Sequence, residues 1–90
     1  MGNLLMDFGG AIKSAKEGKK VARLGWYPGV FAYIVPGNAY PAQSDAAKSY
    51  WGDRLVPYKP YWAVKNPEEV VETWLPNCSD TLAEDWVILD

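Results

Sequence analysis

Histidine is absent from this chain of 90 residues, and cysteine occurs once, as Cys78. The missing histidine removes the commonest general base and the commonest metal ligand of proteins. A Ser–His or Cys–His nucleophile therefore cannot be assembled within the chain, and zinc and copper sites are disfavoured. A single thiol cannot form an internal disulfide, so a reducing cytoplasm is the simplest compartment for the protein.

Long hydrophobic runs and phosphate-binding glycine motifs are missing as well. No stretch approaches the roughly 18 apolar residues that a membrane span needs, so we expect no membrane partner. The segment MGNLLMDFGG lacks a charged start, a long apolar stretch and a cleavage site, so we expect no signal peptide. Neither ARLGWYPG nor GNAYPAQ has the glycine spacing of a dinucleotide-binding turn or a P-loop.

Basic residues are absent from the last quarter of the chain, so the net charge of −2 hides a gradient. Residues 1–25 hold five basic and two acidic side chains, and residues 26–65 hold four basic and two acidic ones. Residues 66–90 hold seven acidic side chains and no basic one. A broad nucleic-acid face needs a basic stripe, so we expect no nucleic-acid polymer as partner. A single small anion near the first half of the chain is compatible with this balance.

What is present predicts a helix followed by several strands. Apolar residues recur at helical spacing between Asp7, which can cap a helix, and Gly18, a natural stop. This predicts a helix over 8–17, with Phe8, Ala11, Ile12 and Ala15 on one stripe. Segments rich in β-formers predict strands over 20–23, 30–35, 61–65, 69–75 and 86–90. We expect the first two strands to form a hairpin, with Val21 pointing inward and the second strand central in the sheet.

Four segments leave more room for interpretation. A helix over 67–73, capped by Asn66, competes with the strand predicted there. Residues 37–51 carry loop signals with one helical turn, and loops of this length are usually functional or disordered. Near the end of the chain we predict a helical turn with Thr81 and Glu84 at capping-box spacing. Pro57 and Pro60 place the segment before residue 61 at a sheet edge or in an extended chain.

The order of these elements predicts a small single α+β domain spanning residues 1–90, with its N-terminal helix packed on an antiparallel sheet. A domain this small buries only about 60–65% of the surface that its unfolded chain exposes, so its stability is marginal. A second subunit is a common remedy because it covers apolar surface that the first cannot. We therefore expect the domain to be oligomeric.

Aromatic residues are numerous, with five tryptophans, six tyrosines and two phenylalanines. We place Phe8, Phe31 and Trp74 in the core, and Trp62 in the core or at a subunit interface. Six further aromatic residues lie beside glycine, proline or predicted turns: Trp26, Tyr27, Tyr40, Tyr50, Trp51 and Tyr58. At such places an aromatic ring is often half-buried, and its face can stack on a nucleotide base. Core or oligomer contact remains the commoner role of such residues, because ligand pockets are few per protein.

Charged side chains offer no assembled reaction centre. Arg23 and Arg54 could each fork onto a phosphate, or form an ion pair with the acidic C-terminal segment. Asp80, Glu84 and Asp85 could be read as a magnesium site or as an acid and base, but carboxylates at a helix start are more often structural. The sequence places no base or helix dipole beside Cys78 to activate its thiol. We expect no catalytic residue, no metal and no cofactor.

Three stretches of the chain resemble a family of small phage and prophage proteins, the second type of Thoeris anti-defence protein. FGGAIKSAKEGKKVARLGW is similar to the family's opening helix followed by V-A-R-x-G-W. LVPYKPYWAVKN resembles its Pro-Tyr-x-Pro-Tyr strand entry, and WLPNCSDTLAEDWVILD resembles its close, W-x-P-x-x-x-D-x-L-A-E-D-W. The three stretches follow in the family's order and cover nearly the whole chain.

The resemblance implies a function that composition does not. Thoeris is a bacterial defence in which an infected cell makes a cyclic ADP-ribose isomer that triggers an effector. The family's proteins act as sponges, which bind this signal, glycocyclic ADP-ribose, without cutting it. The resemblance implies a homotetramer with ligand pockets between protomers, in the host bacterial cytoplasm. It also implies that some members bind cyclic oligonucleotides at a separate site.

The same resemblance assigns ligand-binding roles. It implies that Gly25 and Gly29 hold Trp26 at a turn, where the indole stacks on a base or packs over a ribose. Arg23 meets the pyrophosphate in this reading, and Asp80 and Thr81 hydrogen-bond ribose hydroxyls. The expected site is completed by the two tyrosines of the matching motifs, Tyr27 and Tyr58. Residues 37–51 match no motif and could set the choice of ligand.

Two other functions stay open from the sequence. One is a phosphodiesterase-like enzyme that degrades a cyclic nucleotide with Glu84 or Asp85, which the missing histidine disfavours but does not exclude. The other is a phage protein–protein interaction module that places its aromatics on another protein. Chemically altered ligand would indicate the enzyme, and a stoichiometric protein partner without nucleotide would indicate the module.

Overall fold

The computed structural model describes residues 4–89 of the chain, and they form one α+β domain with an N-terminal helix and an antiparallel sheet. Residues 1–3, at the start of the segment expected not to be a signal peptide, lie outside the described residues. Asp90, the end of the last predicted strand, lies outside them too. No helix within the described part of the chain is long and apolar enough to cross a membrane.

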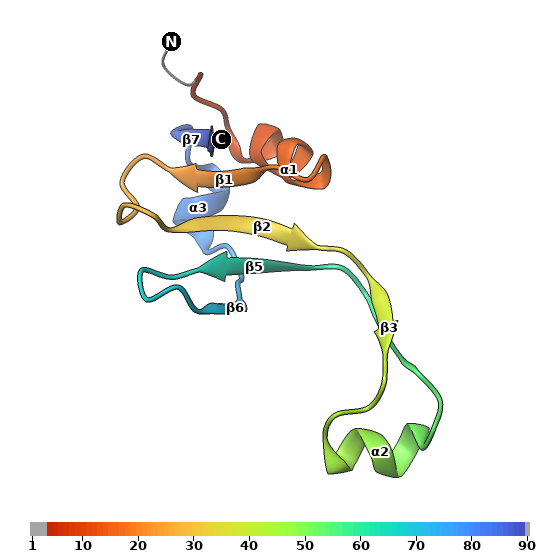
Figure 1. Ribbon diagram of the computed structural model, residues 1–90. Coiled ribbons are helices and arrows are strands. Elements are labelled where there is room, and N and C mark those ends of the chain that lie inside the picture. Colours follow the sequence, from red (N-terminus) through yellow and green to blue (C-terminus); the bar gives the residue numbers. More distant parts are fainter. Residues whose placement is uncertain (1–3, 90) are drawn as a thin grey trace.

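Five strands form the main sheet in the order β6-β5-β2-β1-β7, and every neighbouring pair is antiparallel (Figure 1). Their bounds are β1 Lys20–Arg23, β2 Phe31–Val35, β5 Tyr61–Lys65, β6 Val71–Thr73 and β7 Trp86–Leu89. The pairing of β1 with β2 and the central place of β2 confirm the predictions. The last strand pairs back to the first and forms one edge of the sheet, where Met6 makes a bridge with Trp86.

Helix α1 (Phe8–Lys16) begins where the sequence predicts and ends one residue before the predicted end, with Glu17 as its C-cap. The Asp7 side chain accepts a hydrogen bond of 2.8 Å from the Gly10 N–H, which satisfies one of the free donors of the first turn. Gly18 follows the helix with a φ of +91°, a conformation that residues with a Cβ rarely adopt. The helix packs its small residues Ala11 and Ala15 against the sheet, which lets the two layers approach closely.

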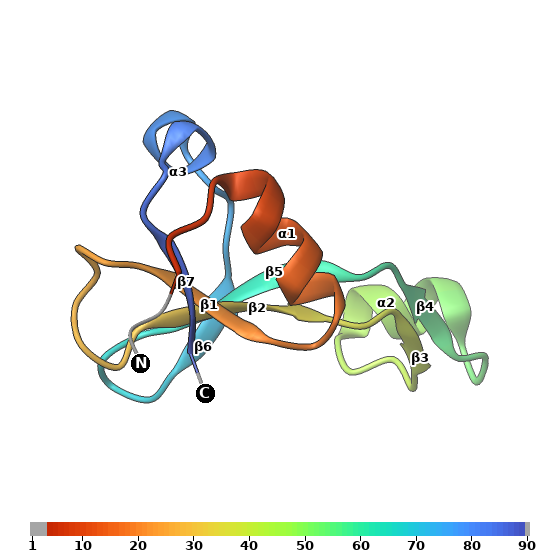
Figure 2. The same cartoon turned by 90° about the horizontal axis from the view of Figure 1, so that it is seen from above.

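Helix α3 (Cys78–Leu82) lies on the same side of the sheet as α1, as Figure 2 shows. Side chains alternate between the two faces of a strand, so this helix-covered face carries Val21, Ala32 and Ile88. The other face, which we call the open face, carries Phe31 and Tyr33 among others and has no helix on it within residues 4–89.

Trp86 forms the centre of the core, with its side chain fully buried. The rings of Phe8, Trp26 and Trp74 lie 5.5, 5.2 and 6.1 Å from it, centroid to centroid. Its indole Nε1–H donates to the Asp80 carbonyl at 2.9 Å, so the one polar atom of the ring is satisfied. Phe8 and Trp74 thus pack in the core as predicted. Trp62 also packs there, which agrees with one of the two roles predicted for it.

Two predictions about the body of the domain are wrong, and the choice left open over 67–73 is resolved in favour of the strand, β6. Phe31 points away from the core, because its neighbour Ala32 takes the helix-covered face, and lysine ammonium groups lie 5.3 and 5.5 Å from its ring. No helix covers 67–73; instead, the Asn66 side chain accepts from the backbone N–H of Glu68 and Val70 and closes a turn before β6. The capping box of α3 consists of Asn77 and Asp80, so Thr81 and Glu84 do not form one.

Residues 36–60 form a protruding arm, and we call the rest of the described chain the body. The arm holds strand β3 (Asn38–Tyr40), helix α2 (Asp45–Trp51) and strand β4 (Val56–Tyr58), and β3 pairs with β4 in a sheet of its own. The chain therefore extends over 50 Å in one direction and 26 Å in the other two (Figure 1). The segment 37–51 was predicted to be a loop with one helical turn, which underestimates its structure.

Candidate functional site

The body contains a cavity of about 460 Å³ at the end of the sheet that is farthest from the arm. It is formed by the loop between β1 and β2, the end of β5, the residue after β6 and the start of α3. Its lining residues are Gly25, Trp26, Tyr27, Val30, Val64, Trp74, Asn77 and Asp80. The structure thus brings four of the seven predicted ligand-binding residues, Gly25, Trp26, Tyr27 and Asp80, into one cavity.

Two consecutive turns shape the β1–β2 loop. The Trp26 N–H donates to the Arg23 carbonyl at 3.1 Å, and the Val30 N–H donates to the Tyr27 carbonyl at 3.0 Å. Gly29 completes the second turn with a φ of +88°, which favours glycine at this position. The turns point the two aromatic side chains in different directions: Trp26 is half-buried, and Tyr27 is 69% exposed.

Trp26 serves the cavity and the core at the same time. Its ring meets Trp74 and Trp86 edge to face, with centroids 5.7 and 5.2 Å apart, a favourable aromatic geometry. The indole is therefore held rigidly as one wall of the cavity. Because the same ring covers Trp86, removing it would disturb the core as well as any bound ligand.

Asp80 is the most heavily used polar side chain of the site. The Asp80 Oδ2 accepts from the Asn77 N–H at 3.0 Å, and the Asn77 side chain accepts in return from the Asp80 N–H at 2.8 Å. The Asp80 Oδ1 accepts from the Arg23 guanidinium at 3.1 Å. Asp80 is almost fully buried. A ribose hydroxyl would thus meet a carboxylate whose two oxygens already have partners within the chain, each with lone pairs to spare.

Arg23 is held between two carboxylates. Its Nε donates to Asp85 at 3.0 Å and its Nη1 to Asp80 at 3.1 Å. These hydrogen bonds, first to Asp85 and then to Asp80, raise the pKa of Arg23 above its ordinary value. The stability that comes from the raised pKa of Arg23 is complete below arginine's ordinary pKa and is lost only at higher pH, so the guanidinium keeps its charge in the working range of proteins. The ion pair with the acidic segment, one of the two roles considered for Arg23, is the one the structure contains.

Arg23 borders a second, smaller hollow of about 300 Å³ on the other side of the same loop. Trp26 and Tyr27 line both hollows, and Val87 and Leu89 close the second one from β7. A ligand phosphate could reach the guanidinium only by competing with Asp80 and Asp85 for it.

The remaining two predicted residues lie elsewhere in this single chain. Thr81 is exposed on α3, and its Oγ1–H donates to the Cys78 carbonyl at 2.9 Å. Tyr58 is on the arm, with its ring 5.9 Å from that of Tyr40. Arg54 is also on the arm, where it donates to the carbonyls of Tyr50 and Trp51 at the end of α2.

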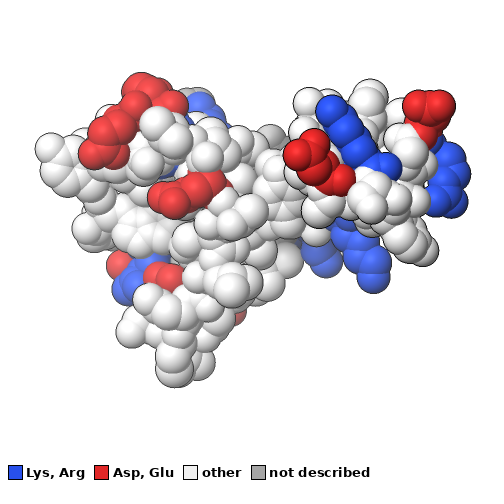
Figure 3. Space-filling view, turned by 90° about the horizontal axis from the view of Figure 1, so that it is seen from below, with Lys and Arg blue, Asp and Glu red and all other residues white. Residues whose placement is uncertain are grey.

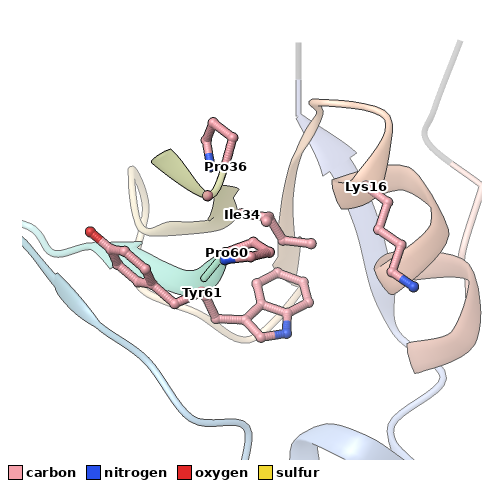
Figure 4. A pocket seen from close by; sticks show the side chains of 7 residues that line it. Lys16, Ile34, Pro36, Pro60 and Tyr61 are labelled. Atoms are coloured by element: carbon pink, nitrogen blue, oxygen red, sulfur yellow. The ribbon is translucent and has the colours of Figure 1, made fainter. Parts of the chain in front are cut away.

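The base of the arm is hollowed on both sides. On the open face, a hollow of about 530 Å³ is lined mostly by apolar and tyrosine side chains, among them Val35, Tyr40, Tyr58 and Tyr61. On the helix-covered face lies a hollow of about 450 Å³, and Figure 4 shows Lys16 of α1 on one side of it with Pro36, Pro60 and Tyr61 on the other. The predicted ligand-binding Tyr58 therefore belongs to a different concavity from Trp26.

Sequence reasoning did not place four residues of the cavity in the ligand site: Val30, Val64, Trp74 and Asn77. The signal for Asn77 was available, because an asparagine followed three residues later by an aspartate is a capping pattern that starts a helix at Cys78. Trp74 was predicted, but only as a core residue. Val64 becomes a wall of the cavity through strand register alone, which the sequence does not give.

Two of the three carboxylates near the site form ion pairs within the chain. Asp80 and Asp85 are both bound to Arg23, and Glu84 is exposed. Among residues 4–89, no group of three or more histidine, cysteine, aspartate or glutamate side chains is placed so that it could hold a metal ion. Cys78 is an exposed free thiol.

Comparison with known proteins adds two findings. The family model of the Thoeris anti-defense 2-like domain matches residues 6–89 of this chain. A protein of Bacillus phage SP01 named Thoeris anti-defense 2 is similar to it, with 31% identity over 91 residues that cover 93% of this chain and 94% of the phage protein.

Proposed function

Because the chain belongs to the family of Thoeris anti-defense 2-like domains, we propose that it is a phage sponge for the Thoeris signal. Family membership supports a phage role against Thoeris. The finer proposal is that the protein binds glycocyclic ADP-ribose, holds it uncleaved and so prevents activation of the effector. It acts in the host bacterial cytoplasm, where the infected cell makes the signal.

The observation that carries the proposal is the cavity that joins Gly25, Trp26, Tyr27 and Asp80. Trp26 offers a rigidly held ring, Tyr27 offers an exposed ring, and stacking of a base on the face of such a ring is worth about 1–3 kcal/mol. The carboxylate of Asp80 and the side-chain amide of Asn77 line the cavity and can form hydrogen bonds with ribose hydroxyls. These are the contacts that a flat, polyhydroxylated nucleotide requires.

A sponge must outcompete the effector, which demands an affinity near nanomolar, roughly −12 kcal/mol. The cavity of one chain is open to solvent, and three aromatic residues line it: Trp26, Tyr27 and Trp74. A homotetramer with its ligands between protomers would supply the second wall, and cyclic oligonucleotides would be further ligands of such an assembly at a separate site. A preformed pocket of this kind reaches high affinity because little ordering is left to the moment of binding.

The direct test is calorimetry with glycocyclic ADP-ribose, followed by heat denaturation of the complex and mass spectrometry of what it releases. We expect tight binding and recovery of the unchanged nucleotide. Recovery of a hydrolysed product, lost again in Glu84→Gln, would overturn the sponge in favour of the enzyme. No heat with the nucleotide, together with a stoichiometric protein partner in phage-infected cells, would overturn it in favour of the interaction module.

Tyr27→Ala is the sharpest variant for this test, because Tyr27 lines the cavity and is largely exposed. We expect it to lower the affinity for glycocyclic ADP-ribose at least tenfold while the melting temperature is unchanged. Tyr27→Phe keeps the ring and serves as the matched control, with affinity close to the wild type. Equal binding by all three proteins would show that this cavity is not the site.

A further inference from the structure

Arg23 is bonded to both sides of the cavity. Its backbone carbonyl accepts from the Trp26 N–H at 3.1 Å and so closes the turn that carries the indole on one side. Its guanidinium donates through Nη1 to Asp80 at 3.1 Å, and Asp80 lines the cavity from α3 on the other side. A single residue at the end of β1 therefore connects the two segments between which the cavity lies.

Helix α3 depends on such contacts for its position. It has five residues, too few to hold a helical structure by itself in water. The capping box lies within the helix, and the bond from the Trp86 Nε1–H holds only the backbone of Asp80. Among residues 4–89, Arg23 is thus the residue that connects the Asp80 carboxylate to the sheet.

Asp85 keeps the Arg23 side chain in this position. The Leu24 N–H donates to the Asp85 carbonyl at 3.1 Å. Arg23 is paired with Trp86 in the sheet, so the backbones of Arg23 and Asp85 are held side by side. The Asp85 Oδ1 accepts from the Arg23 Nε at 3.0 Å, while Nη1 reaches Asp80. A free arginine side chain has many rotamers, and these two bonds to fixed carboxylates select one of them.

The cluster is poorly suited to bind a phosphate itself. One guanidinium faces two carboxylates, and one positive with two negative charges leaves −1. Two of the three guanidinium nitrogens are engaged, and the side chain is only 25% exposed. Residues 24–30 add no charge, and residues 77–85 contain three acidic side chains and no basic one. On the face shown in Figure 3, most basic side chains lie toward the arm, at the right.

We propose that Arg23 is a positioning residue of the site: it holds the Asp80 carboxylate against the Trp26 turn and does not itself bind the ligand. Asp85 acts one step further away, by holding Arg23. The Asp80 carboxylate keeps lone pairs on both oxygens for the ligand. A contact of this kind is effective only when the side chains behind it fix its geometry. The proposal rests on the proposed function for the identity of the ligand.

Calorimetry with glycocyclic ADP-ribose separates positioning from phosphate binding, because the two roles predict opposite signs for one variant. Asp85→Ala removes the anchor of Arg23 together with a negative charge. We expect affinity to fall roughly tenfold or more, since the guanidinium can then turn and move the Asp80 carboxylate with it. An arginine that binds the phosphate predicts a rise, because a competing carboxylate has left. Affinity equal to or above that of the wild type would overturn the proposal.

Two matched variants complete this comparison. Asp85→Asn keeps an oxygen for the Arg23 Nε–H and should recover most of the lost affinity. Glu84→Ala removes an equal charge from the neighbouring exposed position and should bind like the wild type. Equal losses in Glu84→Ala and Asp85→Ala would show an effect of charge alone and would overturn the positioning role.

A double-mutant cycle tests whether Asp85 acts through Asp80. In an Asp80→Asn background, we expect Asp85→Ala to change affinity by less than about twofold, because the carboxylate that it positions is gone. Circular dichroism verifies that each variant is folded at the temperature of the titration. A loss of the same size in both backgrounds would mean general structural damage, and the proposal would fail.

Hydrogen exchange without nucleotide tests the positioning apart from any ligand. The Asn77 N–H donates to the Asp80 Oδ2 at 3.0 Å, so its exchange reports whether that carboxylate is in place. We expect exchange at Asn77 to rise roughly tenfold or more in Asp85→Ala, with β2 and β5 unchanged, and to stay constant in Glu84→Ala. Unchanged exchange at Asn77 in Asp85→Ala would overturn the positioning. If the wild type binds no glycocyclic ADP-ribose while exchange rises as expected, the proposed function fails and the positioning of Asp80 stands.

Discussion

The body and the arm of this domain reach their local structure in the same way but differ in what holds that structure in place. Both have paired antiparallel strands and a capped helix: Asp7 caps α1 in the body, and Ser44 caps α2 in the arm. Only the body has a core, built on Trp86 and the rings around it. In the arm, Val56 is the one buried residue.

The difference teaches that hydrogen bonds shape an element, whereas burial decides how stable it is. Backbone hydrogen bonds and caps give about 1 kcal/mol each in net stability, because the unfolded chain bonds to water instead. Burial of a large aromatic contributes several times more. The arm in a single chain should therefore open and close well below the free energy that unfolds the body.

Removing one tryptophan from each region is the strongest test of this difference between body and arm. Trp86→Ala should lower the free energy of unfolding by about 3–5 kcal/mol, enough to unfold most of a marginal domain. Trp51→Ala on α2 should lower it by less than about 1 kcal/mol, because that ring packs only on Tyr50 and the surface of the arm. Urea denaturation followed by circular dichroism gives both values. Similar losses for the two variants would show that the arm has a core of its own.

The junction between the two regions offers a second test. A Cβ at Gly37 would lie 2.9 Å from the Tyr58 carbonyl oxygen and 3.0 Å from Pro60, both of which are hard to move. We expect Gly37→Ala to cost about 1–3 kcal/mol by forcing β3 and β4 apart. Hydrogen exchange should rise in residues 38–58 and stay constant in β1 and β7.

Gly25→Ala is the matched control for that variant, because a Cβ at Gly25 has open space around it. Its stability should stay within about 0.5 kcal/mol of the wild type. An equal rise of exchange across body and arm in Gly37→Ala would mean that the two regions unfold as one unit.

Much of the body could be predicted from its sequence because its local signals agree with its global fold. Helix α1 has a cap, an apolar stripe and a glycine stop, and the structure follows all three. Strands β1, β2 and β5 are runs of β-formers, and they occupy the predicted residues to within one position. Phe31 was misplaced because β2 has apolar residues on both faces, so its composition does not tell which face is covered.

The arm and part of the candidate site could not be predicted for a physical reason. Prolines, glycine and polar residues in 36–60 are typical of a loop, and nothing local reveals that β3 and β4 pair across α2. The cavity around Trp26 depends on strand register and on the capping box of α3, both of which join residues far apart in the chain. The family's motifs marked Trp26 and Asp80, but they say nothing of the ion pairs that hold Arg23.

The smallest and most precise comparison is between one helix cap in each region. Asn77 in the body accepts from the Asp80 N–H at 2.8 Å, and Ser44 in the arm accepts from the Ala47 N–H at 3.1 Å. Replacing either capping residue with alanine lowers the stability of its helix by about 1 kcal/mol. Asn77→Ala should lower the free energy of global unfolding by that amount, because α3 is tied to the core through Asp80 and Trp86.

Ser44→Ala should leave global unfolding unchanged and raise hydrogen exchange in residues 45–51 only, because α2 contributes no buried side chain to the unit that unfolds. The measurement is exchange at a protein concentration where the chain is monomeric. Repeated at a concentration where the proposed homotetramer forms, the same variant should lose about 1 kcal/mol of global stability if the assembly buries the arm, because the arm then unfolds together with its partner. A cap whose effect does not change with concentration would show that the arm stays outside the assembly.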